Sequence, residues 1–496
     1  MYNLAQKDMT HKFAKFSAFV KKTGLSRGDF KDVMRWGEVY GHILYTNQAG
    51  IYRDDDFERL LVSRCTNEYQ LIFEQVKPLK ELHVISAPLA TGGHTRLMER
   101  IIALRECGDV LITRPILDVE SKLRLPCDTK IHQKMQGFSL EELIEIVAKY
   151  KTIFLHINPD DLLASVAVGV VKNLTGNQVI FVNHADHVFS FGFLCADLVA
   201  EVSSYGFFLS QKKRVVASSF LGIPLQLDGF KKIESNTTSR RNKYLEILSA
   251  GSPLKYKPSA ALSFPKLAGR VLKEIPAARV TIVGPDVWLD WWWWLIKLRN
   301  PFRLRILKSM PYDKYVSALT CADIYLDSLP MTGGTALPEV RSKGIPVSGL
   351  LSGSSGYTPF DATKFSDQDA LVAALRDYSV DRSGAILNMN NDGNIIDSAF
   401  RVHGPRALKY RLDGMVDHGE IFRPYDDATI FDIFFYRNQW ISGGVINVSL
   451  SSLRFFLKNW SSGGKEAFLL FIDSINVRQI FWLVASIFKK FLSGKF

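Results

Sequence analysis

Residues 323–348 read DIYLDSLPMTGGTALPEVRSKGIPVS, and this stretch decides the fold. A short apolar strand pattern is followed by a glycine-containing turn, then by a helical pattern from about Thr335, then by a second strand pattern. Strands that alternate with helices indicate parallel βαβ units. Because ligands bind at the carboxyl ends of parallel strands, the turn after the first strand is the first place to search for a site.

The same alternation fills two regions, on either side of a polar, turn-rich stretch at 228–242 that we interpret as a linker. Strand patterns lie at 82–88, 109–115, 151–159 and 177–187, and then at 244–252, 278–286, 303–311 and 323–330. We therefore predict an α/β protein with two tandem Rossmann-like domains. The predicted divisions are a helical extension at 1–80, an N-terminal domain at 81–230, a C-terminal domain at 241–405, and returning helices with a basic amphipathic tail at 406–496.

The composition of the 496 residues is that of a globular protein, with 47% hydrophobic and 23% charged residues. The net charge is +12, from 62 basic and 50 acidic residues, but no nucleic-acid-binding motif or long basic run accompanies it, so we expect no nucleic-acid partner. The five cysteines are far apart, which argues against a disulfide framework or a zinc site. No signal-peptide core or run of transmembrane length occurs, and we expect a cytoplasmic location.

The turn at 331–335 is the strongest candidate binding loop. Gly333 and Gly334 allow a ligand to approach the backbone, and Thr335 is placed to cap the following helix. Free amides and the helix dipole at that end suit a diphosphate. Glu339, in the first turn, is placed to accept hydrogen bonds from ribose hydroxyls, although an ordinary strand-to-helix turn explains the same pattern.

A second loop, at 250–258, follows the first strand of the same domain. It carries Lys255 and Lys257, which could neutralise phosphates, although exposed lysines are usually only solvated. No complete GxGxxG fingerprint and no GxxxxGK[ST] phosphate loop occurs anywhere in the chain.

Histidines follow or end three strands of the N-terminal region. His94 lies in the turn after the first strand, His156 ends the third, and His184 and His187 follow the fourth. A histidine at that rim suits a general base on an acceptor hydroxyl, because its pKa lies near working pH. Asp186 could orient a flanking imidazole. Structural histidines are the commoner explanation for any one of these positions, and the His94 loop could instead bind an anionic or sugar acceptor.

These segments together resemble the GT-B glycosyltransferases. The segments AGSPLKYKP (250–258), VTIVGP (280–285) and SMPYDKYVSALTCADIYLDSLPMTGGTALPEVRSKGIPV (309–347) are similar to the donor domain of that fold. The pattern is nearest to family 4 (group 1), with some similarity to the O-GlcNAc-transferase-like families in the GGT segment. The resemblance covers roughly residues 80–400, including Gly92 and Gly93 and the strands that end in histidine.

The resemblance implies transfer of a sugar from a UDP- or GDP-sugar to an acceptor hydroxyl, with no other cofactor and no essential metal. It implies that Glu339 holds the ribose, that 333–335 form the phosphate loop, and that Lys255 or Lys257 lies near the diphosphate. The backbone of Met310 and Pro311 would read the nucleobase. The acceptor groups implied are Gly92, Gly93, Arg96 and His156, and the catalytic groups are His94, His184, His187 and Asp186.

One position departs from the family pattern. Retaining family 4 enzymes usually carry a glutamate eight residues before the ribose-binding one, and here that position is Met331. Retention or inversion of the anomeric configuration therefore stays open. Two other functions also stay open: a sugar-nucleotide epimerase of the same fold, and a non-catalytic scaffold that binds glycan or lipid.

Two segments combine aromatic and basic residues. WLDWWWWLIKLRNPFRLR (288–305) includes Trp291, Trp292, Trp293 and Trp294, and the tail INVRQIFWLVASIFKKFLSGKF (475–496) includes Phe481, Trp482, Phe488, Lys489 and Lys490. This composition is typical of a membrane interface, although both segments could pack as core. We expect a peripheral protein on the cytoplasmic face of the inner membrane, with both segments on one face. A lipid-linked glycan acceptor in bacterial lipopolysaccharide, O-antigen or other surface-polysaccharide assembly would fit, and the oligomeric state stays open.

Overall fold

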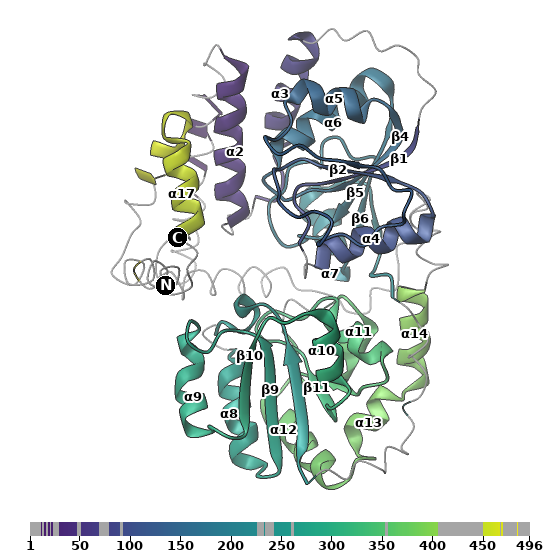
Figure 1. Cartoon of the computed structure of the whole chain (residues 1–496), viewed down its shortest axis with the longest axis vertical. Coiled ribbons are helices and arrows are strands. Elements are labelled where there is room, and N and C mark those ends of the chain that lie inside the picture. The colour runs from purple at the N-terminus through teal and green to yellow at the C-terminus, as the bar shows by residue number, and fades with distance from the viewer. Residues whose placement is uncertain are drawn as a thin grey trace. The chain divides into compact units, whose positions relative to one another are not determined.

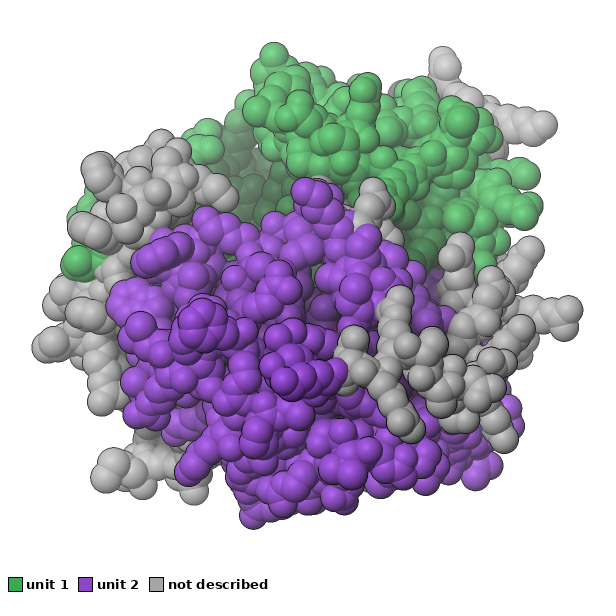
Figure 2. Space-filling view, turned by 60° about the horizontal axis from the view of Figure 1, so that its bottom comes forward, with its two compact units in different colours: residues 1–202, 206–219, 438–496 green, residues 203–205, 220–437 purple. Residues whose placement is uncertain are grey.

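The computed structural model of the chain describes most of its residues. These are residues 11, 14–15, 18–19, 21–22, 29–46, 51–68, 79–89, 93–225, 233, 243–258, 262–352, 356–404, 450–466, 468–469 and 484. The chain divides into two compact units, which Figure 2 colours separately. Unit 1 comprises Met1–Val202, Gly206–Ser219 and Asn438–Phe496, and unit 2 comprises Ser203–Tyr205 and Phe220–Arg437.

Unit 1 is built on a seven-stranded parallel sheet of order β3-β2-β1-β4-β5-β6-β7. In Figure 1, α5 and α6 lie on one side of this sheet and α4 lies on the other. The strands are β1 (Leu79–Ile85), β2 (Asp109–Ile112), β3 (Ile131–His132), β4 (Tyr150–His156), β5 (Gln178–Asn183), β6 (Leu198–Glu201) and β7 (Ser218–Phe220). The helices are α4 (Gly93–Arg105), α5 (Leu140–Val147), α6 (Leu162–Thr175), α7 (Ser204–Leu209) and η1 (Ser210–Arg214).

Unit 2 is built on a five-stranded parallel sheet of order β10-β9-β8-β11-β12. Its strands are β8 (Leu245–Ala250), β9 (Ala278–Gly284), β10 (Leu304–Lys308), β11 (Ile324–Leu326) and β12 (Val347–Ser348). Its helices are η3 (Pro253–Tyr256), α8 (Phe264–Glu274), η4 (Trp291–Trp293), α9 (Trp294–Arg299), α10 (Tyr312–Leu319), α11 (Ala336–Ser342), η5 (Pro359–Thr363), α12 (Gln368–Val380), α13 (Ala385–Asn390) and α14 (Gly393–His403).

Local sequence explains where several of these helices begin and end. Ser139 caps α5 in a capping box with Glu142, because the serine side chain accepts from the Glu142 amide and the glutamate accepts from the Ser139 amide. Asp161 caps α6, which ends at Gly176 in the left-handed conformation that glycine adopts readily. The central strands of both sheets are almost wholly buried and rich in Val, Ile and Leu, as strands covered on both faces must be.

Helices outside the two sheets come from both ends of the chain. Helices α2 (Phe30–Thr46) and α3 (Asp55–Glu68) precede β1, and α17 (Leu450–Lys458) and η6 (Trp460–Ser462) follow residue 449. α17 lies beside α2 (Figure 1), and the Phe455 ring stacks on His42 with 4.8 Å between ring centroids. Of the predicted linker, the structure describes Ile233, whose amide donates to Asn391 Oδ1 over 2.7 Å.

The tryptophan-rich segment forms the crossover between β9 and β10 in unit 2. Parallel neighbours need such a crossover, and η4 with α9 supplies it. Trp293 is fully buried in the core of unit 2, where its ring meets Tyr256 and Phe264. The prediction that all four consecutive tryptophans face a membrane is therefore wrong for Trp293, and Trp292 packs partly against the same core.

No helix within the described ranges is long and apolar enough to cross a membrane. The predicted tail residues Phe481, Trp482, Phe488, Lys489 and Lys490 lie outside the described residues. Their membrane role therefore stays a prediction.

Candidate functional site

The site in unit 2 lies where the sheet order reverses. All five strands are parallel. From β8 the chain adds β9 and β10 on one side of the sheet and then β11 and β12 on the other, so the switch point falls between β8 and β11. The loops after these two strands meet there: Lys255 Nζ donates to the carbonyl of Thr332 over 2.9 Å, and the Met331 amide faces the Lys255 carbonyl at 3.4 Å. This is the position at which open α/β sheets bind ligands.

The two predicted lysines have different surroundings. Lys255 is tied to the glycine loop through Thr332, next to Gly333. Lys257 instead has its ammonium 6.0 Å from the centre of the Trp292 ring, a cation–π arrangement at the start of the crossover. Of the two, Lys255 is therefore the better placed for an anion at the switch point.

The reason for glycine at position 333 differs from our prediction. Asp327 Oδ1 accepts hydrogen bonds from the amides of Gly333 and Ser328, at 2.8 and 2.9 Å. A Cβ at position 333 would lie 2.6 Å from Asp327 Oδ1, so glycine is required for this internal contact. The Gly333 amide is thus not one of the free donors expected for a diphosphate.

The helix after this loop begins as predicted but is capped differently. α11 starts at Ala336 with Thr335 at its N-cap position, yet the Thr335 side chain makes no capping hydrogen bond, which corrects the prediction. Glu339 lies in the first turn and is partly buried. Gly334 has φ +42°, a backbone conformation that favours glycine. Met310 and Pro311 lie between β10 and α10, at the edge strand of the sheet.

A buried ion triplet supports the glycine loop from behind. Lys364 Nζ lies 2.7 Å from Asp327 Oδ2 and 2.6 Å from Asp361 Oδ1, and all three side chains are almost inaccessible to solvent. Burial alone would lower the pKa of Lys364, but the two carboxylates outweigh it and hold that pKa above its usual value. Lys364 therefore keeps its charge and fixes Asp327 in the position that receives the Gly333 amide.

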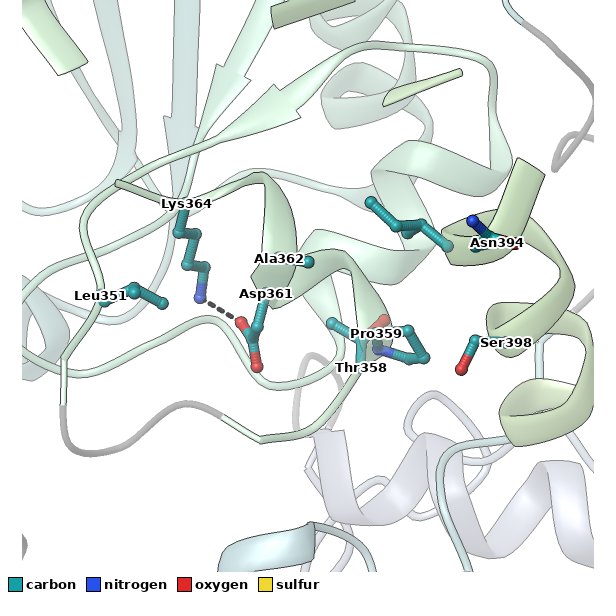
Figure 3. A pocket seen from close by; sticks show the side chains of 9 residues that line it. Leu351, Thr358, Pro359, Asp361, Ala362, Lys364, Asn394 and Ser398 are labelled. Carbon is teal, nitrogen blue, oxygen red and sulfur yellow. Dashed lines mark ion pairs between the residues drawn. The ribbon is translucent and has the colours of Figure 1, made fainter. Parts of the chain in front are cut away.

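A cavity of about 370 Å³ adjoins this triplet within unit 2. Asp361 and Lys364 contribute to its wall, together with Thr358 and, from α14, Asn394 and Ser398 (Figure 3). None of the predicted donor residues lines it. Its connection to the site is indirect, from Lys364 through Asp327 to Gly333.

In unit 1, His156 is buried beneath the sheet rim. His83 Nδ1 and His156 Nε2 are 3.0 Å apart, and the two rings stack with centroids 5.3 Å apart. Burial lowers the pKa of His83 to about 3 and holds the pKa of His156 well below its usual value. Only 1% of His156 is exposed, so a direct contact with an acceptor, as we predicted, is not available in this conformation.

His94 and His184 are brought together by the fold. Their rings stack with centroids 4.9 Å apart, and His94 Nε2 lies 3.2 Å from the Ala87 carbonyl oxygen. Burial lowers the pKa of His184 to about 3 and also lowers that of His94. A group with so low a pKa is a weak general base near neutral pH, which disfavours the catalytic role predicted for His184.

His187 and Asp186 form the contact that we predicted. His187 Nδ1 lies 3.1 Å from Asp186 Oδ1, with the aspartate wholly buried and the imidazole partly exposed. A carboxylate in this position fixes the orientation of the imidazole ring. His187 is therefore the predicted histidine best placed to act as a base.

The predicted acceptor residues near α4 have different surroundings. Arg96 is paired with Glu99 and also donates to the Lys122 carbonyl over 3.0 Å. Gly93 begins α4 and is exposed, and Gly92 is not among the described residues. In the part of the chain that the structure describes, no group of three or more His, Cys, Asp or Glu is arranged to hold a metal ion.

Two groups of polar residues near the candidate sites were not predicted from the sequence. Asp327, Asp361 and Lys364 form the triplet in unit 2, and Asp327 directly follows β11, a signal that was available. In unit 1, Arg114 and Asp160 pair over 2.9 Å beyond the ends of β2 and β4. In each case, a charged residue just after a parallel strand is the sequence pattern that indicates such a group.

Comparisons with known proteins bear on the fold. No family model matches the sequence, and no curated protein sequence matches it. Among solved structures, Anabaena HepE crystallised with UDP-glucose is similar at 11% identity and a TM-score of 0.50, over 68% of this chain and 100% of that one. The chain has the GT-B fold. The two tandem Rossmann-like domains predicted from sequence are thereby confirmed.

Further GT-B-type structures match with lower TM-scores. An O-GlcNAc transferase from Thermobaculum terrenum is 16% identical with a TM-score of 0.45, over 82% of this chain and 77% of that one. A UDP-GlcNAc 2-epimerase from Neisseria meningitidis, crystallised with UDP-GlcNAc, is 12% identical with a TM-score of 0.41. The match covers 68% of this chain and 99% of the epimerase chain.

Proposed function

We propose that this protein is a glycosyltransferase that uses a nucleotide sugar, UDP- or GDP-linked, and needs no metal. The observation that carries the proposal is the meeting of Lys255 with the glycine loop at the switch point of unit 2. A lysine at this position can stabilise the diphosphate that leaves during sugar transfer. The crystallisation of HepE with UDP and UDP-glucose supports a UDP-sugar as donor.

A ligand screen tests the donor class. UDP, GDP, UDP-glucose, UDP-N-acetylglucosamine and GDP-mannose are each added to the full chain, and the shift in apparent melting temperature is measured. A ligand that binds the native state must raise it. Release of free nucleoside diphosphate with EDTA present is expected of a metal-independent transferase. A new sugar nucleotide with its phosphate bond intact would instead indicate an epimerase, and no shift with any of the five would contradict the proposal.

Glu339 provides the test of the donor site itself. We expect Glu339→Ala to weaken binding of the stabilising nucleotide about 10- to 100-fold, because a carboxylate that accepts from ribose hydroxyls contributes roughly 1.5–3 kcal/mol. Calorimetric titration of the nucleotide measures this. Lys343→Ala, an exposed change at the other end of α11, is the matched control and should bind as wild type. An unchanged affinity in Glu339→Ala would remove the ribose assignment.

The proposal extends to a lipid-linked glycan acceptor in surface-polysaccharide assembly, with the protein peripheral on the cytoplasmic face of the membrane. Support comes from an exposed apolar surface on the crossover of unit 2, which we call the α9 surface. Three of its side chains are 78–89% exposed, those of Trp288, Leu298 and Phe302. The α9 surface consists of Trp288, Trp291, Trp294, Leu295, Leu298 and Phe302.

The spacing and charge of the α9 surface suit an anionic bilayer. Positions 291, 294, 295 and 298 follow helical periodicity and so share one side of the crossover. Between Trp291 and Lys308 the sequence contains five basic residues and no acidic one. Exposed tryptophans beside basic side chains match the headgroup region of a membrane, where amphipathic rings and cations are both stabilised.

Vesicle flotation tests this surface. The triple variant Trp291→Ala, Leu298→Ser, Phe302→Ser is expected to bind vesicles containing phosphatidylglycerol at least tenfold more weakly, because each lost apolar side chain removes roughly 1–3 kcal/mol of burial. Val380→Ser, at an 87% exposed apolar position at the end of α12, is the control and should float as wild type. Equal flotation of the triple variant would show that the α9 surface does not dock on the bilayer.

A further inference from the structure

Helix α2 packs closely against unit 1 because two glycines allow it. A Cβ at Gly37 would lie 2.3 Å from Leu162 Cδ2, and one at Gly41 would lie 2.2 Å from Phe191 Cε2. Both distances are far below van der Waals contact, so a larger residue would force either the helix or the Leu162 and Phe191 side chains to shift. The glycines flank Glu38 on the same helix and bring it to the start of α6, where Asp161 is the N-cap.

The place where α2 docks is the switch point of unit 1, between β1 and β4. The polar residues that follow the neighbouring strands gather there. Thr113 Oγ1 donates to Asp161 Oδ2 over 2.5 Å, and Ser86 Oγ donates to the same oxygen. Asp160 accepts from Arg114 at 2.9 Å and pairs with His42 Nδ1 of α2 at 3.0 Å. Parallel α/β sheets bind ligands at such a position.

Glu38 differs from its neighbours because none of the described residues forms a hydrogen bond or ion pair with its carboxylate. Asp160, Asp161, Arg114 and His42 each make the contacts given above. In the part of the chain that the structure describes, no hydrogen bond or ion pair involves the Glu38 side chain, although most of it is withdrawn from solvent. An unpartnered buried carboxylate is costly, and an apolar side chain of similar length would fill the space without that cost.

The charges around Glu38 come from the ends of three elements. Asp160 and Asp161 precede α6, Arg114 follows β2, and Lys458 ends α17. Burial and then Asp161 raise the pKa of Glu38 to about 7, with Asp160 acting in the same direction and Arg114 and Lys458 opposing. Tyr45, one turn beyond His42 on α2, also faces Asp160 and Arg114, and burial raises its pKa. A carboxylate that titrates near neutrality can both take and release a proton at working pH.

We propose that Glu38 is the catalytic base for the acceptor, at a polar site that α2 completes over the unit 1 switch point; this role rests on the proposed transferase function. The acceptor hydroxyl gives its proton to a Glu38 oxygen while its own oxygen bonds to the anomeric carbon of the donor sugar. The bond from that carbon to the phosphate oxygen breaks, and its electron pair leaves with the nucleoside diphosphate. A single displacement of this kind inverts the anomeric configuration, which fits the absence of a second glutamate at Met331.

The test uses the full chain, the sugar nucleotide identified by the ligand screen, and water as the acceptor. Glu38→Gln keeps the shape of the side chain and removes its basicity. Its kcat should fall about 10²- to 10⁴-fold, while nucleotide affinity and the unfolding midpoint stay as in wild type. In wild type, kcat/KM should fall as the pH drops below about 7, because protonated Glu38 cannot accept a proton, and this acidic limb should be lost in the variant. Asp32→Asn, nearer the start of α2, is the control and should match wild type.

Two results would overturn the role of Glu38, and a third would contradict the single displacement. One is a Glu38→Gln variant with kcat within threefold of wild type and an unchanged acidic limb. The other is the full loss of turnover in His187→Gln with little loss in Glu38→Gln, which would make the imidazole the base. Retention of configuration in the product, read by NMR, would also contradict a single displacement. Failure of wild type to bind any nucleotide is a different result, since it contradicts the transferase function itself.

Discussion

Replacing Lys364 with methionine is expected to lower the free energy of unfolding by about 3–5 kcal/mol, because it leaves Asp327 and Asp361 buried together without a cation. Denaturant titration followed by circular dichroism measures the loss. Nucleotide binding should weaken as well, because Asp327 holds the amide of Gly333.

A half-exposed ion pair in the same unit provides the control for Lys364. Arg376 lies 2.6 Å from Glu274 with about half of its side chain in solvent, and pairs of this kind contribute about 0–1 kcal/mol. Arg376→Met should therefore unfold almost as wild type. A Lys364→Met protein as stable as Arg376→Met would show that the triplet does not anchor the glycine loop.

The second large effect is expected inside the tryptophan-rich crossover. Trp293→Ala should cost about 3–5 kcal/mol of unfolding free energy, because it empties a fully buried site between Tyr256 and Phe264. Trp288→Ala, five residues earlier and largely exposed, should change stability by no more than about 0.5 kcal/mol. Thermal and denaturant unfolding of both variants measure the difference.

The same pair of variants separates packing from membrane binding. Trp288 belongs to the α9 surface and Trp293 does not, so vesicle binding should weaken in Trp288→Ala while stability holds. Trp293→Ala should lose stability but should still bind vesicles as wild type at temperatures where it stays folded. Equal stability losses in the two variants would contradict the assignment of Trp293 to the core and Trp288 to the surface.

Much of the fold was predictable because it depends on local periodicity. Apolar runs of four to seven residues, each followed by a turn and a helical pattern, predict parallel strands whichever way the sheets are ordered. The sequence therefore predicted the strand that ends at His156 and the strand that precedes Gly333. The two-residue strand β3 and the short strands β6 and β7 were not predicted, because so few residues carry no detectable period.

The candidate site was predictable in position but not in detail. Gly333, Gly334 and Glu339 lie at the end of a strand that the sequence identifies. Which lysine approaches them depends on how the loop after β8 turns, and only the fold shows Lys255 on Thr332 and Lys257 on Trp292. Glu38 has no local signal beyond two flanking glycines, because its neighbours Arg114 and Asp161 are distant in the chain.

By itself, the sequence determined that the chain forms two α/β units and which loops lie at the carboxyl ends of their strands. Local patterns carry that information because strand and helix periods are set within a few residues. The tertiary structure alone decided that Trp293 is core while Trp288 is surface, and that Asp327 accepts from the Gly333 amide. It also decided that, among the described residues, none forms a hydrogen bond or ion pair with the Glu38 carboxylate. These outcomes depend on burial and on the approach of residues that are distant in the chain, such as Glu38 and Asp161, which no local pattern encodes.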